Sequence, residues 1–279
     1  MERKVREKVT GFRTRDGAGV SLVRVLGNGT VKEYDPILML DSFDSTSPDD
    51  YTAGFPMHPH RGIETISYVY QGQMNHRDSL GNEDTTADGE VQWMTAGSGI
   101  MHEEKLLPRD RMLGVQLWLN LPAKDKMVTP AYHSIKNKEI QEIPVEGGKV
   151  RLLAGEYEGK KGYKSKYLPL NYYDVHLESG ASLVISTDEN RSVTVFTLLG
   201  DAYIGGWMVK EKTAAKLTEG EEVEVRAGEE KVQLLFISSL PLDEPVVWGG
   251  PIVMNTREEL QRAFDDLEKG TFLQEEISY

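Results

Sequence analysis

Alternating apolar and polar residues recur along most of the chain and predict β-strands. Residues 65–78 alternate, turn at Gln71-Gly72 and alternate again, which is the pattern of a β-hairpin. Residues 113–120 place three leucines and a valine on one face, as a core strand does. Other short runs follow turn signals rich in Gly, Asn and Asp. This pattern predicts an all-β fold built from sandwiches or barrels.

A polar, charged stretch at residues 136–148 interrupts these strands and ends in two glycines. Such a segment is a natural boundary between domains, and the strand pattern starts again after it. We therefore expect an N-terminal domain over residues 1–135 and a C-terminal domain over residues 136–279. The candidate strands of the second domain are residues 150–153, 172–177, 182–186, 193–199 and 232–237.

One segment has the periodicity of a helix. Thr256 and Glu259 form a capping box, and Leu260, Phe264 and Leu267 form an apolar stripe. Gly270 stands where a helix C-cap belongs. We expect a short C-terminal helix that packs on the second domain.

Two short segments concentrate side chains that bind metals. His58 and His60 are two residues apart, and so are His102 and Glu104. Residues two apart in a strand share a face, so each pair can chelate an ion if neighbouring strands bring the pairs together. We predict one divalent metal site with these four residues as ligands.

Two other carboxylates compete with Glu104 as the fourth ligand. Glu103 would face away from His102 in an alternating strand. Glu64 has the parity of the first histidine pair but follows Arg61-Gly62, which can interrupt the alternation. Glu104 is therefore preferred.

The remaining histidines are expected to have structural roles. His76 lies beside Arg77 and Asp78 and is expected to be hydrogen-bonded, while His133 and His176 are assigned to the surface or to caps. A chance His-x-His pair in an exposed turn is the alternative to a metal site, and the second chelating pair argues against it.

A weak internal repeat predicts two copies of one barrel. Gly72 aligns with Gly200, and the spacing of Gly89 and Gly97 recurs later in the chain at Gly220 and Gly228. These offsets place other residue types opposite the chelating pairs, so the second copy is expected to lack the metal. The residues placed there are Ser186, Asp188, Gln233 and Leu235.

Composition narrows the class of protein. The 32 Lys and Arg against 45 Asp and Glu give a net charge of −13, so the chain has no basic field for nucleic acid or anionic lipid. Cysteine is absent, so a metal must take N and O ligands. The N-terminus is charged and has no apolar signal segment, which predicts a cytoplasmic protein without membrane contact.

With these features the sequence resembles the pirin family of the cupin superfamily. The matching segments are residues 58–62, 76–81, 91–97, 99–102 and 244–256. The resemblance implies a bicupin, with two face-to-face antiparallel β-barrels and a short C-terminal helix, and with metal only in the N-terminal barrel. It also names His58, His60, His102 and Glu104 as ligands.

The resemblance implies an oxidoreductase similar to quercetin 2,3-dioxygenases. Glu104 would bind the metal and accept a proton from the 3-hydroxyl of a flavonol, a small aromatic chelating substrate. Three imidazoles and a carboxylate suit Fe(II), our first choice, or Mn, Ni, Cu or Zn. The alternatives are a non-catalytic, metal-dependent regulatory protein that acts through protein partners, and a purely structural metal. A monomer is expected.

The sequence departs from the family at two places. Glu103 stands where members often have a small residue, and we expect it to add negative charge near the entrance and to disfavour bulky anionic substrates. The run Trp248-Gly-Gly-Pro251 replaces a Trp-Tyr-Gly-Pro run in the half without metal, where no catalytic consequence is expected. Trp93 and Met94 are assigned to the core first and to a pocket wall second.

Overall fold

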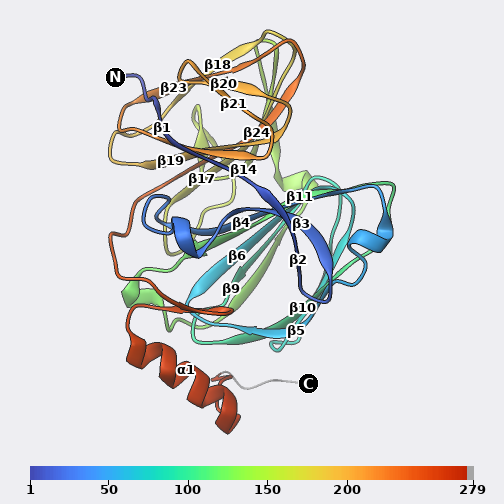
Figure 1. The fold of residues 1–279 in the computed structure, drawn as a ribbon, viewed down its shortest axis with the longest axis vertical. Coiled ribbons are helices and arrows are strands. Elements are labelled where there is room, and N and C mark those ends of the chain that lie inside the picture. The colour runs from blue at the N-terminus through green and yellow to red at the C-terminus, as the bar shows by residue number, and fades with distance from the viewer. Residues whose placement is uncertain (275–279) are drawn as a thin grey trace. The chain divides into compact units, whose positions relative to one another are not determined.

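The computed structural model describes residues 1–274, which form two compact units of β-sheet (Figure 1). The larger unit comprises residues 13–31, 37–137 and the chain from residue 242 onward. The smaller unit comprises residues 1–12, 32–36 and 138–241. The prediction of an all-β protein with a short C-terminal helix is confirmed.

The larger unit is built on two large antiparallel sheets and a two-stranded one, β25-β26. Seven strands in the order β12-β9-β6-β11-β4-β3-β2 form the first sheet, and four in the order β5-β10-β7-β8 form the second. The first sheet consists of β2 (Phe12–Asp16), β3 (Val20–Leu26), β4 (Ile37–Ser45), β6 (Ile63–Gln71), β9 (Glu90–Thr95), β11 (Met112–Asn120) and β12 (Ala131–Ile135). The second consists of β5 (Phe55–His60), β7 (Met74–Asp78), β8 (Glu83–Thr86) and β10 (Ile100–Leu106).

The smaller unit repeats this plan. Its sheets have the orders β1-β22-β19-β24-β17-β14-β13 and β18-β23-β20-β21, and β15 pairs with β16. The large sheet consists of β1 (Val5–Thr10), β13 (Gln141–Val145), β14 (Gly148–Ala154), β17 (Leu170–Leu177), β19 (Ser192–Leu199), β22 (Thr213–Leu217) and β24 (Val232–Ser239). The others are β15 (Glu156–Tyr157), β16 (Lys160–Lys161), β18 (Ser182–Ser186), β20 (Ala202–Ile204), β21 (Trp207–Val209) and β23 (Glu222–Ala227). Each unit is thus built on a seven-stranded and a four-stranded sheet, with a two-stranded sheet added, and not on a closed barrel.

Short 3₁₀ turns connect several of these strands. They are η1 (Asn28–Thr30), η2 (Pro48–Asp50), η3 (Ala123–Asp125) and η4 (Asn137–Glu139). The central strand β11 is buried along its whole length, because it lies between β4 and β6 in the large sheet. It therefore supplies both apolar core residues and the few polar side chains that face the space between the sheets.

The C-terminal helix α1 (Arg257–Lys269) begins and ends where predicted. Thr256 and Glu259 form the capping box, and Gly270 takes the left-handed conformation at the C-cap. The prediction that this helix packs on the second domain is wrong. Its buried Ala263 lies in an apolar cluster with Ile252, Met254 and Phe272 of the larger unit. In residues 1–274, no helix combines the length and the apolar character needed to cross a bilayer.

A buried arginine explains where the helix docks. The side chain of Arg61, 2% exposed, lies 2.7 Å from the Asp266 carboxylate of α1. Its other nitrogens donate to the carbonyl oxygens of Ser98 and Phe272. Asp266, which the sequence pattern gives no reason to bury, thus neutralises a charge that would otherwise lie unpaired in the larger unit.

Strands β25 (Val247–Gly249) and β26 (Ile252–Met254) pair with each other and bring the same C-terminal segment against the first half of the chain. Arg61 forms a β-bridge with Ile252. Gly62 has a φ of 79°, and a Cβ there would lie 2.1 Å from the carbonyl oxygen of Val253. Only glycine allows this approach.

The ends of the chain therefore differ from the predicted domain ranges. Strand β1 pairs with β22 in the smaller unit, whereas residues from 242 onward belong to the larger unit. Local periodicity identifies a strand or a helix but does not identify the sheet edge or surface to which it adds.

The repeat is real at the level of topology, and Gly72 and Gly200 follow equivalent strands, but the residues placed opposite the chelating pairs were wrong. The strand orders make β10 equivalent to β23 and β5 to β18. The pairing of His102 with His58 then corresponds to that of Val223 with Ile185, and Glu104 corresponds to Val225. The offset that aligns Gly97 with Gly228 gave the wrong equivalents for β10, because Gly97 precedes β10 whereas Gly228 follows β23. Ile185, Val223 and Val225 are buried and apolar, and their side chains have no atom that binds a metal. The absence of metal from this unit stays a prediction.

The docking of α1 can be tested by removing its buried ion pair. We expect Asp266→Ala to lower the free energy of unfolding by about 2 kcal/mol, because it leaves the Arg61 charge buried without its carboxylate. Urea unfolding measures this difference. Glu268→Ala, at an exposed position of the same helix, should change the free energy by less than about 0.5 kcal/mol. Equal effects of the two substitutions would contradict the assigned role of Asp266.

Candidate metal centre

The two predicted chelating pairs lie on neighbouring strands. Strand β10 lies between β5 and β7, and His102 is opposite His58 on one side and Asp78 on the other. A register shift between His102 and Glu104 marks a β-bulge in the pairing with β5. The bulge changes the direction in which the following side chains point.

Three histidines converge in this sheet. Nitrogen atoms of His58, His60 and His102 lie within 4.8 Å of one another. The Nε2 atoms of His58 and His60 are 3.1 Å apart. Their Nδ1 atoms lie 2.8 Å and 2.9 Å from the carbonyl oxygens of Pro56 and Pro251. A carbonyl oxygen only accepts, so each Nδ1 carries the proton and each Nε2 presents a lone pair.

These lone pairs face each other in a buried place. Burial, together with the neighbouring His58, lowers the pKa of His60 to about 3, so this imidazole is neutral near pH 7. The two Nε2 atoms, 3.1 Å apart, are close enough to share a proton or to bind one cation between them. Neutral imidazole whose other nitrogen donates to a carbonyl is the usual form of a metal-binding histidine.

His102 gives the clearest sign of a missing partner. Its side chain is 1% exposed, and neither ring nitrogen has a hydrogen-bond partner. Burial, then the adjacent His60 and His58, hold its pKa well below the usual range. An unsatisfied buried polar atom costs about 1–3 kcal/mol, and a metal ion would supply the partner. The residues present therefore fit a divalent transition metal.

Glu104 is not one of the three residues of this cluster. Both of its carboxylate oxygens accept hydrogen bonds, one from the Nε2 of Gln92 and the other from the Nε2 of Gln116 at 2.9 Å. It belongs to a second group of metal-binding atoms with His102 and His76. The four predicted ligands thus form two overlapping groups that share His102, and the role of Glu104 as the fourth ligand stays a prediction.

His76 was assigned a structural role, and the structure places it among the candidate donors. Its Nε2 donates to Asp78 over 2.9 Å, as expected, but its buried Nδ1 has no partner. Burial raises the pKa of Asp78, but hydrogen bonds from His76 and Asn82 outweigh it and lower the pKa. A carboxylate behind one ring nitrogen is typical of a metal-binding histidine. The two-residue spacing of His76 and Asp78 was the available signal in the sequence.

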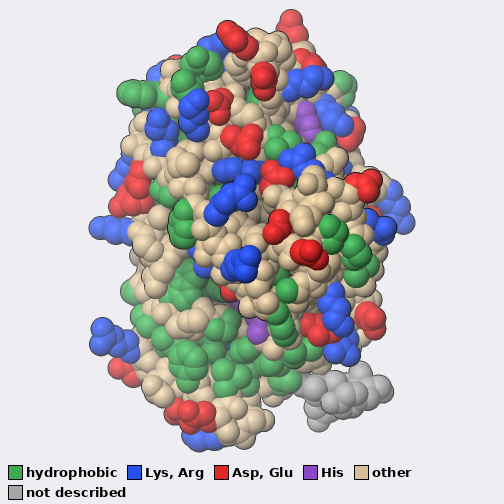
Figure 2. Space-filling view, turned by 45° about the vertical axis from the view of Figure 1, so that its right-hand side comes forward, with side chains coloured by type: hydrophobic (Ala, Val, Ile, Leu, Met, Phe, Trp, Pro, Cys, Tyr) green, Lys and Arg blue, Asp and Glu red, His purple; other side chains and the backbone are tan. Residues whose placement is uncertain are grey.

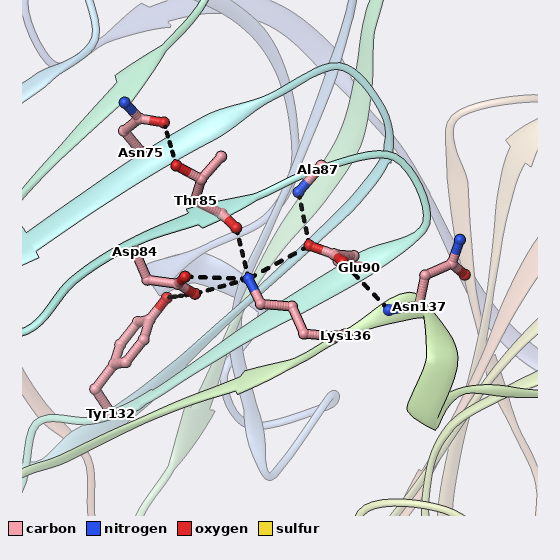
Figure 3. A network of polar contacts seen from close by, with 8 residues as sticks. All are labelled: Asn75, Asp84, Thr85, Ala87, Glu90, Tyr132, Lys136 and Asn137. Carbon is pink, nitrogen blue, oxygen red and sulfur yellow. Dashed lines mark hydrogen bonds and ion pairs between the residues drawn. The ribbon is translucent and has the colours of Figure 1, made fainter.

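A polar network supports His76 from outside. The ring of Tyr132 stacks on that of His76 with centroids 4.3 Å apart, and its hydroxyl donates to Asp84. Lys136 binds Asp84 and the carbonyl oxygen of Thr85, as Figure 3 shows. These contacts fix the plane of the His76 ring.

The two rival carboxylates face elsewhere. Glu103 forms ion pairs with Arg77 at 2.9 Å and Lys105 at 3.5 Å, which offset its charge; its expected effect on anionic substrates at the entrance stays a prediction. Glu64 accepts a hydrogen bond from Thr95 over 2.6 Å. Neither belongs to a candidate metal group in the described part of the chain.

A cavity of about 690 Å³ in the larger unit opens onto His58 and His60. In Figure 2 a histidine is visible among hydrophobic side chains. The cavity walls are mainly apolar, with a few charged and amide side chains. They include Met39, Phe55, Trp118 and Trp248 as apolar residues, and Asp16, Arg24, Asp41 and Gln116 as polar ones.

The aromatic part of this wall includes two tryptophans that the sequence pattern did not assign to it. Trp93 and Met94 are core residues, as first expected, and the aromatic wall is instead formed by Trp118 and Trp248 with ring centroids 5.7 Å apart. Trp248 and Pro251 belong to the larger unit. Their segment was expected in the half without metal, but it lies in the larger unit, where Pro251 accepts a hydrogen bond from His60; that it has no catalytic consequence stays a prediction.

Comparison with known proteins finds similarity, along nearly the full chain, to the family that the sequence motifs resemble. Residues 19–119 match the family model Pirin, and residues 172–273 match the Pirin C-terminal cupin domain. A Pseudomonas aeruginosa protein provisionally named quercetin 2,3-dioxygenase is 39% identical over 96% of this chain and 97% of its own.

Solved structures share the fold. Quercetin 2,3-dioxygenase from Acinetobacter baumannii superposes with a TM-score of 0.90 at 33% identity, over 98% of this chain and 99% of that one. A bacterial pirin from Escherichia coli, solved with nickel(II), has a TM-score of 0.65 at 20% identity, over 84% and 98% of the two chains. The predicted two-cupin fold is confirmed.

The place of His76 in the centre can be tested by metal affinity. We expect His76→Gln to weaken binding of Co(II) about tenfold, because groups that contact the ligands or support them typically contribute 10–100-fold. Competition with a chromophoric chelator measures the affinity. The control is His176→Gln in the smaller unit, where Asp174 accepts a similar hydrogen bond over 2.8 Å. If both variants bind Co(II) like the unsubstituted protein, His76 is only a packing residue.

Proposed function

The chain belongs to the pirin family, and we propose that it is a metal-dependent dioxygenase that opens the central ring of flavonols such as quercetin with O₂. One observation carries the proposal. His58 and His60, whose Nε2 atoms face each other at 3.1 Å, border an aromatic-walled cavity of about 690 Å³, and their ring nitrogens lie within 4.8 Å of an unsatisfied nitrogen of His102. A site of this kind suits a small planar ligand that chelates a metal.

We assign the metal to His58, His60, His102 and Glu104, with Fe(II) preferred and Mn, Ni, Cu or Zn as alternatives. When bound, such an ion would act as a Lewis acid toward the hydroxyl and keto oxygens of the substrate and provide open positions for oxygen chemistry. The three imidazoles add no charge, so the bound ion keeps its attraction for an ionised oxygen.

The cavity wall would orient the substrate. Trp118 and Trp248 present aromatic faces inclined by 31° to each other, and Trp118 also meets the His60 ring edge to face with centroids 4.8 Å apart. A flat aromatic ligand can stack on such a wall, which excludes water from the reacting ring.

Glu104 would accept the proton of the substrate hydroxyl. Gln116 holds it from the cavity wall, and Gln92 holds it from the core. Each carboxylate oxygen keeps a further lone-pair direction for a proton or an ion. Fixed orientation of a general base is what its efficiency requires.

The regulatory alternative receives no specific support from the described residues. The candidate metal ligands other than His58 are buried, and His58 and His60 line a cavity. We therefore place the enzymatic function first.

The proposal predicts flavonol-dependent oxygen consumption. Protein loaded with Fe(II) should consume one O₂ and release one CO for each quercetin whose ring opens, and both gases can be measured. His60→Ala should lower the rate by at least about tenfold, because removal of a ligand costs at least as much as removal of its support. The control is His133→Ala on β12, whose exposed side chain does not line the cavity. Equal rates for the unsubstituted protein and His60→Ala at saturating metal would falsify metal-dependent turnover.

A further inference from the structure

The cavity wall contains a charged cluster that the proposed chemistry does not use. Arg24 binds the Asp41 carboxylate through two hydrogen bonds, from Nε at 3.0 Å and from Nη2 at 2.7 Å. Its Nη2 also lies 2.6 Å from Asp16. All three residues line the cavity, and these bonds occupy three of the five N–H groups of the guanidinium.

Stability alone does not explain this cluster, because burying a charged carboxylate costs free energy on folding. Asp41 is 2% exposed, and its burial outweighs the pull of Arg24 and raises its pKa to about 6. Buried ion pairs can often be replaced by apolar residues without loss of stability. In an otherwise apolar pocket, a few convergent polar groups typically orient a ligand.

The register of the large sheet places the cluster relative to Glu104. Asp41 pairs with Arg24 on one side and with Gln116 on the other. Neighbouring strands are about 4.8 Å apart, so Arg24 lies roughly 10 Å from Gln116 along this row. Gln116 holds Glu104. A planar ligand of three rings can span such a distance, with one end at the metal centre and the other at Arg24 and Asp41.

We propose that Arg24 and Asp41 form a subsite for hydroxyl groups on the substrate ring farthest from the metal-chelating oxygens. This inference rests on the proposed function and narrows its substrate class to flavonols with a hydroxylated pendant ring. A phenolic hydroxyl donates to Asp41 and accepts from an N–H of Arg24. Charge-assisted bonds of this kind are stronger than neutral ones, so the subsite selects among flavonols that chelate the metal equally well.

Ligand affinity tests the subsite without turnover. Protein loaded with redox-inert Zn(II) is titrated with three flavonols that have zero, one or two hydroxyls on the pendant ring. We expect the dihydroxylated flavonol to bind about tenfold more tightly than the one without hydroxyls, which corresponds to about 1.4 kcal/mol. In Arg24→Gln/Asp41→Asn, which removes both charges together, the ratio should fall to within about twofold of unity.

A second ion pair, whose carboxylate lies on β4 like that of Asp41, serves as the matched control. Arg111 lies 2.7 Å from Asp44, and neither residue lines the cavity. Arg111→Gln/Asp44→Asn should keep the tenfold ratio. The subsite is overturned if the unsubstituted protein binds all three flavonols equally, whatever the stability of the variants, or if Arg24→Gln/Asp41→Asn keeps the ratio.

Oxygen uptake by the Fe(II) protein, measured separately, distinguishes this inference from the proposed function. A tenfold affinity ratio without oxygen uptake supports the subsite and removes the dioxygenase. Oxygen uptake with equal affinities supports the dioxygenase and removes the subsite.

Discussion

The larger unit is organised around three imidazoles whose metal-binding nitrogen atoms face one another within 4.8 Å. His58 and His60 bring their Nε2 lone pairs to 3.1 Å, and the two ring nitrogens of His102 are buried without a partner. These arrangements are fixed by the backbone, because Pro56 and Pro251 accept the hydrogen bonds that set the tautomers of the first pair. Most polar atoms in a folded core find hydrogen bonds. A set of neutral imidazoles kept unsatisfied together is therefore best understood as a preformed metal site.

The C-terminal segment completes this site from the other end of the chain. Pro251 orients His60, Trp248 forms part of the cavity wall, and Gly62 allows β26 to pass close to the first chelating segment. The ion pair of Arg61 with Asp266 anchors α1 beside it. The exchange of chain ends between the units thus brings Pro251 to His60, although the two residues are 191 positions apart in the sequence.

Much of the centre was predictable, because its pattern is local. Strand alternation alone paired His58 with His60 and His102 with Glu104, and it placed Glu103 on the opposite face. The same spacing in His76 and Asp78 also predicts a shared face of a strand. Trp248 could not be assigned to the cavity, because nothing in a short window of sequence tells which unit a terminal segment joins. The residues placed opposite the chelating pairs were wrong for a related reason: similar glycine turns lie before one strand and after its counterpart, while the strand orders agree.

The most direct test of the metal centre is the stoichiometry of metal binding. Isothermal titration of the chelator-treated protein with a divalent transition metal should give one ion per chain. The same titration of His102→Ala, which removes the side chain common to both groups of donors, should give no measurable binding. A chain that binds no ion, or a His102→Ala variant that binds like the unsubstituted protein, would contradict the account.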